Sequence, residues 1–290
     1  MNETVSLHDF FALFGSSIAA SAVAAALCGY LGFFVVSRRI AFVSAALGQI
    51  SGLGVALGFW AGTFFGVDPH QHMPVWLDPV VMALILTGLV SAAMSSVNRI
   101  QRTTSESAVA FAYLTAGALA LLVLASPRVV NEAHEVNDLL FGNTVAVRSE
   151  HLVELIGVAL LVLVSHVFLY KDLLFVSFDR EMAKTLKLPV TLLDLILLVS
   201  VGISVAVATR AVGALPVFGF LVLPAGAALL VVESVPGVIA LSMVGALLAA
   251  GAGFYWSFIA SLPTGPMMVM CCALFWPLAG AVRLVSKRRA

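Results

Sequence analysis

Long apolar runs dominate this sequence and restrict what it can fold into. A helix of about 20 residues crosses the hydrocarbon core of a bilayer, and helices satisfy their own backbone hydrogen bonds in lipid. The sequence therefore predicts an all-α, polytopic bundle of transmembrane helices. The predicted spans are 14–37, 41–66, 79–97, 107–126, 152–170, 191–209, 212–232, 236–258 and 266–284. The two segments that flank Arg210 and Ala211 could form one bent passage or two helices, so we expect eight or nine spans.

The composition supports this class. Hydrophobic residues make up 61% of the chain and charged residues 10%, against about 45–50% and 25% in soluble domains. Between the apolar runs, no segment is polar and long enough to fold as a soluble domain, so we expect one transmembrane domain over residues 1–290. The first ten residues, MNETVSLHDF, lack the positive charge of a cleaved signal peptide, and we expect them to remain in the chain.

The positions of Lys and Arg predict the orientation, because these residues concentrate in cytoplasmic loops. With nine spans and the N-terminus outside, the C-terminus is cytoplasmic. Twelve basic residues then fall on the cytoplasmic side: Arg38, Arg39, Arg99, Arg102, Lys171, Arg180, Lys184, Lys187, Arg283, Lys287, Arg288 and Arg289. Three fall outside: Arg128, Arg148 and Arg210. We expect a multi-pass protein of the inner (plasma) membrane.

Sequence motifs for catalysis are absent. The chain has no G-x-x-x-x-G-K-[ST], G-x-S-x-G or H-E-x-x-H sequence, and Cys28, Cys271 and Cys272 lie in apolar runs without metal-ligand spacing. Asp194 and His166 are ionisable groups within spans, but both lie near the predicted inner ends, whereas ion-driven carriers need ionisable groups buried in the membrane. We therefore expect no enzymatic activity and no bound cofactor, and any transport should draw energy from elsewhere. Nothing indicates nucleic-acid binding.

The main predicted inner loop, 171–190, reads KDLLFVSFDREMAKTLKLPV. Its apolar residues recur at helical spacing, which predicts a short amphipathic helix with Ser177 as N-cap and Pro189 at its end. Such a helix could lie on lipid headgroups or bind a partner protein. In the second span, Gly54, Gly58, Gly62 and Gly66 recur every fourth residue, a spacing that favours close helix packing.

Several motifs, in order along residues 25–285, resemble the permease family of ABC transporters that import zinc, manganese or iron (the ABC-3 type). They are GYLGFFVVSRRIAF, TTSESAVAFAYLTAGALALLVLAS, DLLFGNTVAV, LLFVSFDREMAKTLKLPV, AVGALPVFGFLVLPAGAALL and GFYWSFIASLPTGPMMVM. The resemblance implies a separate ABC ATPase subunit that binds ATP and magnesium, an extracytoplasmic solute-binding protein and a second permease copy as a homodimer. It also implies that the inner helix inserts into the ATPase through residues around Phe178, Asp179, Glu181 and Ala183. Lys187 departs from the family, which usually has glycine there.

The segment VSAALGQISG, residues 43–52, bears on the cargo. Metal-importing members of the family carry an Asp and a His four residues apart here, one helical turn, and this chain has Ala45 and Gln49 instead. Ala45 has no donor atom, so a metal ligand pair is not expected. Gln49 could form a helix–helix hydrogen bond, or it could line a polar pathway together with Ser44 and Ser51.

Other candidate contacts are scattered along the chain. His70 and His72 in one predicted outer loop and His134 in another could bind metal or a partner, although solvated loops explain them equally simply. His166 could guard an exit or reach from the interface toward water.

The resemblance favours one function, and the sequence leaves two alternatives. The expected function is the permease subunit of an ATP-driven importer for a divalent transition metal. An uncharged segment at Ala45 and Gln49 also suits a metal complex or a small polar organic solute. A non-transporting scaffold or sensor is a further alternative.

Overall fold

The structure is a computed structural model that describes residues 7–66, 74–97, 105–126 and 149–287. Within these ranges the chain is helical and has no strand, which confirms the predicted all-α class. The elements are α1 (Leu7–Ser37), α2 (Ala41–Phe64), η1 (Val75–Leu77), α3 (Pro79–Val97), α4 (Ser105–Leu124), α6 (Ser149–Phe178), α7 (Arg180–Thr185), α8 (Val190–Val212), α9 (Ala214–Val231), α10 (Val235–Ala260), α11 (Thr264–Ala273) and α12 (Phe275–Lys287).

Eight segments of the described chain are long and apolar enough to cross a membrane, counting α11 and α12 together as Thr264–Val285. Helix α3 contributes a shorter apolar stretch, Pro79–Ser95. The helical conformation is interrupted between α8 and α9 at Gly213, whose φ of 91° favours glycine. The segments around Arg210 are therefore two helices, and Arg210 lies inside α8 rather than at the break.

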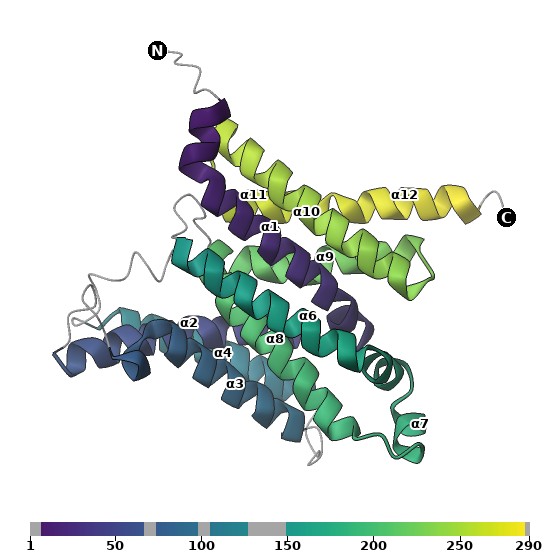
Figure 1. Cartoon of the computed structure of the whole chain (residues 1–290), viewed down its shortest axis with the longest axis horizontal. Coiled ribbons are helices and arrows are strands. Elements are labelled where there is room, and N and C mark those ends of the chain that lie inside the picture. Colours follow the sequence, from purple (N-terminus) through teal and green to yellow (C-terminus); the bar gives the residue numbers. More distant parts are fainter. Residues whose placement is uncertain (1–6, 67–73, 98–104, 127–148, 288–290) are drawn as a thin grey trace.

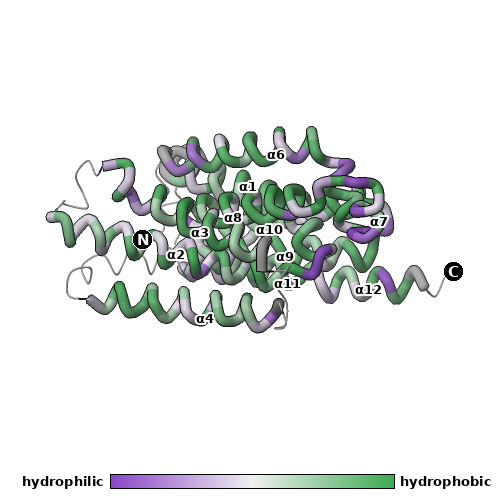
Figure 2. The backbone as a smooth tube through the Cα atoms, turned by 90° about the horizontal axis from the view of Figure 1, so that it is seen from below, coloured by the Kyte–Doolittle hydropathy of each residue, from purple (hydrophilic) through white to green (hydrophobic). Residues whose placement is uncertain are grey.

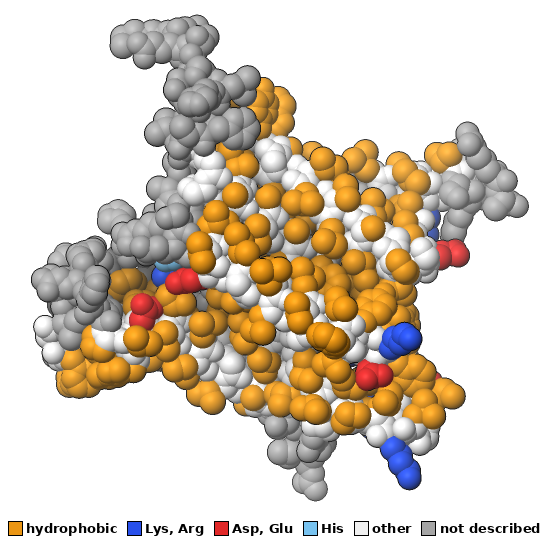
Figure 3. All heavy atoms as spheres, viewed as in Figure 1, with side chains coloured by type: hydrophobic (Ala, Val, Ile, Leu, Met, Phe, Trp, Pro, Cys, Tyr) orange, Lys and Arg blue, Asp and Glu red, His pale blue; other side chains and the backbone are white. Residues whose placement is uncertain are grey.

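The helices form a bundle with charged side chains near its two ends. In Figure 1, α1 begins on the left, whereas α7 and the last turn of α12 lie on the right. Figure 3 shows a band of hydrophobic side chains with charged ones near its two edges. We call the edge that carries α7 the α7 end. The charge distribution predicts that this end faces the cytoplasm.

Burial differs sharply among the helices. Figure 2 shows α6 and α4 on opposite sides of a central group of helices. Helices α1 and α2 are 72% buried over their most apolar window, whereas α4 and α6 are 22% buried. The largest fully buried side chains include Phe33, Phe34 and Phe220. Lipid can therefore cover the outer helices, while the central ones form the protein core.

Helices α2 and α3 approach closely through glycine. A Cβ atom added to Gly54 would lie 2.5 Å from the Cα atom of Ala83, and one added to Gly58 would lie 2.6 Å from the Cα atom of Pro79. The predicted role of this glycine series in helix packing is confirmed for these two residues. Gly66 lies beyond the end of α2 with a φ of 72° and serves the turn instead.

The helical boundaries around residue 178 differ from the prediction. Helix α6 continues to Phe178, because Leu173 and Val176 remain buried in the core after the charged pair Lys171–Asp172. The expected N-cap at Ser177 is wrong: its hydroxyl donates to the carbonyl of Leu173, one turn back. Asp179 caps α7, accepting a hydrogen bond of 2.8 Å from the backbone N–H of Met182.

The end of α7 also differs from the prediction. Helix α7 ends at Thr185, and Lys187 then adopts a left-handed conformation with a φ of 57°. Pro189 is the N-cap of α8 and does not end α7. A left-handed residue after a helix commonly reverses the chain and favours glycine.

Candidate functional site

An ion cluster joins three helices at the α7 end. Asp194, in the second turn of α8, receives hydrogen bonds from two arginines. Arg38 Nη1 lies 2.7 Å from Asp194 Oδ1, and Arg180 Nη2 pairs with Asp194 Oδ2. We call these three residues the Asp194 cluster. The carboxylate of Asp194 is thereby paired through both oxygens, which is the usual requirement for a largely buried charge.

Arg38 extends this cluster to α6. Its Nε donates to Ser177 Oγ at 2.8 Å, and its Nη2 donates to the carbonyl oxygen of Leu173 at 3.1 Å. Burial lowers the pKa of the Arg38 guanidinium, and Asp194 opposes that shift. One guanidinium therefore connects the end of α1 to the last turns of α6 and to the start of α8.

Helix α7 presents an apolar surface away from the bundle. Ala183 is fully buried against the protein, whereas Phe178 is 67% exposed and Met182 and Leu186 are also exposed. Met182 and Leu186 are four residues apart and share one face of α7. Phe178 ends α6 before the extended residue Asp179, and its ring lies 6.5 Å from that of Phe33 in α1. Glu181 and Lys184, paired at 2.7 Å, flank this face. An exposed apolar face with a charged rim is typical of a docking surface.

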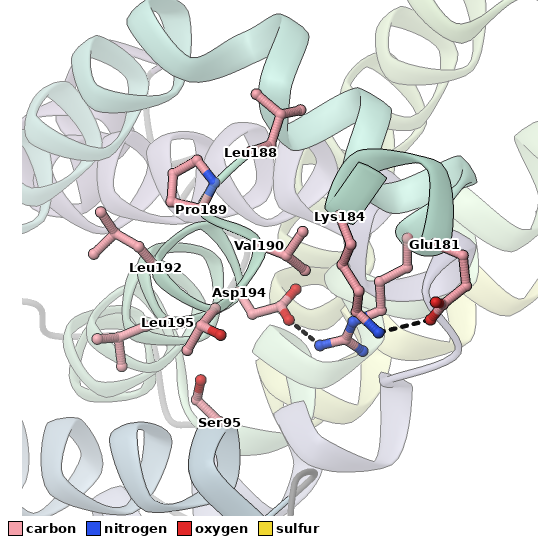
Figure 4. A pocket seen from close by; sticks show the side chains of 11 residues that line it. Ser95, Glu181, Lys184, Leu188, Pro189, Val190, Leu192, Asp194 and Leu195 are labelled. Atoms are coloured by element: carbon pink, nitrogen blue, oxygen red, sulfur yellow. Dashed lines mark hydrogen bonds and ion pairs between the residues drawn. The ribbon is translucent and has the colours of Figure 1, made fainter. Parts of the chain in front are cut away.

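A cavity of about 1000 Å³ opens beside α7 and the start of α8. Figure 4 shows Asp194, Lys184 and Glu181 around it, with Ser95 of α3 on another side. Its charged lining residues are already engaged, because Asp194 pairs with arginine and Lys184 pairs with Glu181. Within the described residues, no group of three His, Cys, Asp or Glu side chains could hold a metal ion.

The segment 43–52 lies within α2 and is divided between two faces. Ser44 and Ser51 are buried, and the Ser44 hydroxyl donates to the carbonyl of Ala41 at 2.7 Å. Seven residues correspond to about two turns, so these serines share a face, whereas Gln49 lies roughly 140° from Ser44 around the helix. The structure therefore does not bring Gln49 together with the two serines. Their role in a pathway stays a prediction.

Gln49 points toward α4. Its Oε1 atom lies 3.2 Å from the position that a Cβ atom would take on Gly117. Gly117 thus leaves room for the Gln49 amide between α2 and α4. Ala45, one turn earlier, is half-buried. The positions of the expected ligand pair therefore carry one small neutral side chain and one amide at a glycine-lined contact.

His166 occupies an unexpected environment. It lies in the interior of α6, which continues for three more turns, and its side chain is fully buried. The rings of Tyr30 and Phe34 lie 5.6 and 5.7 Å from its ring, and neither ring nitrogen has a hydrogen-bond partner. The expectation that His166 reaches toward water is wrong, because α6 packs this side against α1. His70, His72 and His134 lie outside the described residues.

The comparison with family models decides the classification. The model of the ABC 3 transport family matches residues 11–282, nearly the whole chain. The chain belongs to the ABC 3 transport family.

The relatives of this chain include metal transport proteins. The chain is 25% identical over 264 residues to the manganese transport system membrane protein MntC of Halalkalibacterium halodurans, covering 91% of this chain and 85% of that one. It is 24% identical over 250 residues to the high-affinity zinc uptake system membrane protein ZnuB of Haemophilus influenzae, covering 86% and 89%. Both alignments extend over most of each chain.

The fold also matches a solved structure. PsaBC from Streptococcus pneumoniae, in complex with Fab, superposes with a TM-score of 0.77 and 21% identity, covering 95% of both chains. Together with the helices described above, this supports a membrane permease fold for this member of the ABC 3 transport family.

Sequence reasoning missed the Asp194 cluster in this ABC 3 transport family protein. It noted Asp194 only as a rare charge within a span and Arg38 only as a topology signal. The useful signal was the combination, because a carboxylate near a membrane boundary needs a cationic partner. Phe178 ends α6, Asp179 caps α7, and Glu181 and Ala183 lie within α7; their contact with an ATPase stays a prediction.

Proposed function

We propose that this chain is the permease subunit of an ATP-driven importer and that its cargo is a divalent transition metal. Manganese and zinc lead, because the relatives MntC and ZnuB carry those metals in their names; iron is the third candidate. The observation that carries the transport mechanism is α7, a short helix with an exposed apolar face that is fixed to the bundle by Asp194.

The proposed energy source is a separate ATPase subunit that binds ATP and Mg²⁺. Phe178, Met182 and Leu186 would enter an apolar groove of that subunit, while Glu181 and Lys184 would face its rim. Asp179 supports this surface from within, since its carboxylate caps α7. Closure of the ATPase would then push on α7 and, through it, on the helices of the permease.

Two further partners are proposed: an extracytoplasmic binding protein at the opposite end of the bundle and a second permease copy. An extracytoplasmic binding protein would supply affinity for the metal, and two permease chains would enclose the pathway. In such a system the membrane segment needs no strong metal site of its own, because a tight site halfway across slows release. Ala45 and Gln49 fit this role, since neither binds a divalent ion firmly.

The ATPase contact can be tested by co-purification. We expect Phe178→Asp to abolish capture of the ATPase subunit by the tagged permease while leaving the permease folded, because this side chain is largely exposed. The matched control is Trp76→Asp. Trp76 is also an exposed aromatic residue, but it lies at the opposite end of the bundle from α7, so this variant should retain the ATPase. Normal capture by Phe178→Asp would contradict docking through α7.

The cargo can be tested in cells. A host that lacks its own manganese and zinc importers should regain growth in metal-poor medium when it expresses the complete transporter. Growth that returns only in complexes with an active ATPase would support metal import. Unchanged growth with a correctly assembled transporter would contradict the assignment.

A further inference from the structure

The Asp194 cluster lies between α7, the proposed docking site of the ATPase, and the helices of the permease. Helix α7 is bound to Asp194 through Arg180, and α1 is bound to the same carboxylate through Arg38. The chain runs directly from α6 through α7 to α8, whereas α1 is separated from this region in sequence by α2, α3 and α4. Arg38 and Asp194 are 156 positions apart in sequence, and their contact connects α1 to α7 in space.

Helix α7 has few packing contacts with the bundle, so the Arg180–Asp194 contact is important for holding it. On one side of α7, the cavity lined by Glu181, Lys184 and Thr191 replaces side-chain packing. On the other side, Ala183 is buried and Arg180 reaches Asp194. A helix of six residues held at so few points can move as a unit. Its movement reaches the bundle through the groups that hold it.

Arg38 lies at the junction of α1 and α2. Helix α1 ends at Ser37 and α2 begins at Ala41, and Arg39 between them adopts a left-handed conformation with a φ of 58°. Ile40 N–H donates to the carbonyl of Val35 at 2.9 Å, which closes this turn. Gln49 follows Ala41 by eight residues, or about 12 Å along the helix axis. A displacement of Arg38 therefore acts at the start of the helix that carries Ala45 and Gln49.

We propose that Asp194 is a positioning residue that transmits the movement of α7 to α1 and α8 and, through Arg38, to the beginning of α2. This inference rests on the proposed docking of an ATPase at α7. Arg180 delivers the movement, Asp194 receives it through one carboxylate oxygen, and Arg38 takes it from the other. The bonds from Arg38 to Ser177 and Leu173 keep the end of α6 in the same unit.

The test compares transport with ATP hydrolysis in the complete transporter. In proteoliposomes supplied with manganese or zinc and the binding protein, the number of ions accumulated per ATP hydrolysed should fall about fivefold or more in Asp194→Asn and Arg180→Gln. Asp194→Glu, which keeps the charge, should restore part of the ratio. Glu154→Gln is the matched control: it removes an arginine–carboxylate pair between α6 and α8, with Arg210 at 3.4 Å, and should keep the wild-type ratio.

A purely structural role gives a different result. It predicts less assembled complex but an unchanged ratio in the complexes that do assemble, and this outcome would overturn the proposal. If the Asp194→Asn complex fails to assemble, Arg180→Gln is the deciding variant. Arg180 is half-exposed, and its substitution removes only the link between Asp194 and α7. An unchanged ratio in Arg180→Gln would likewise overturn it.

A second measurement does not depend on the cargo. In a background where Cys28, Cys271 and Cys272 are replaced by serine, the reactivity of Gln49→Cys toward a water-soluble thiol reagent reports on α2. We expect this reactivity to change between the nucleotide-free and ATP–vanadate states, and Asp194→Asn to abolish the change. The same change in both proteins would overturn the proposal. A change that requires Asp194, without any metal accumulation, would support the proposal and contradict the metal cargo.

Discussion

Arg38 Nη1 and Asp194 Oδ1 lie 2.7 Å apart at the α7 end, and both side chains are 11% exposed. Arg38 directly follows the last residue of α1, Asp194 lies in α8, and the two meet where the bundle adjoins α7. Because each charge is largely removed from water, each depends on the other for compensation. This pair therefore fixes the relative positions of α1 and α8.

The first prediction compares the loss of Asp194 with the loss of Arg180, its more exposed partner. Asp194→Ala leaves the buried guanidinium of Arg38 without its counter-charge, and we expect it to lower the free energy of unfolding by about 3–5 kcal/mol. Arg180→Ala should cost no more than about 1 kcal/mol, since its side chain is 48% exposed and solvent screens the pair. Melting temperatures in detergent provide the comparison. Equal losses in the two variants would contradict the difference in burial.

The second prediction concerns the contact of α2 with α3. Gly54→Ala would place a methyl group 2.5 Å from the Cα atom of Ala83 and 2.9 Å from its nitrogen, so the two backbones must separate. We expect a loss of about 1–3 kcal/mol of stability. Gly88→Ala in α3 is the control, because nothing lies within 4 Å of the added Cβ atom. Thermal unfolding should show a loss for the first variant alone; a similar loss for both would refute this packing.

The third prediction uses the left-handed conformation of Lys187. A side chain at a φ of 57° costs about 1 kcal/mol, which glycine does not incur. Lys187→Gly should therefore raise the melting temperature by about 2–4 °C. Lys187→Ala removes the same charge but keeps the Cβ atom, so it should give no gain. A decrease for Lys187→Gly would show that this turn is not strained.

The fourth prediction concerns His166. Both of its ring nitrogens are buried without a partner, and each such group costs about 1–3 kcal/mol relative to an apolar replacement. We expect His166→Leu to be at least as stable as the wild type despite the lost contacts with Tyr30 and Phe34. His166→Gln, which keeps a polar group, should show no such gain. A clear drop in melting temperature for His166→Leu alone would reveal a polar partner for this histidine.

The spans could be predicted well from the sequence, because an apolar run of membrane length has few alternatives in lipid. The C-terminal boundary of α6 could not be predicted in the same way. Lys171 and Asp172 resemble the end of a span, but the helix continues because Leu173 and Val176 bury against other helices. The identity of such tertiary partners is not contained in a local pattern. Similarly, the break between α8 and α9 falls at Gly213, just after the junction that was expected at Arg210 and Ala211.

The candidate site shows the same division. The residues around α7 are contiguous in sequence, so their spacing predicted a short helix with one apolar face. The Asp194 cluster joins residues separated by 156 and 14 positions, and nothing in either neighbourhood identifies the other. Gln49 illustrates a further limit. Its helical position was clear, but its contact with Gly117 depends on how α4 packs.

The most direct test of the central claim is metal uptake by the reconstituted transporter. Proteoliposomes would contain the permease and its ATPase, with the binding protein outside, and would receive manganese, zinc and iron(II) in separate experiments. Mass spectrometry would count the metal inside with and without ATP. We predict ATP-dependent accumulation of at least one ion. Steady ATP hydrolysis without accumulation of any of them would contradict the divalent-metal assignment and would favour a metal complex or a small polar solute as the cargo.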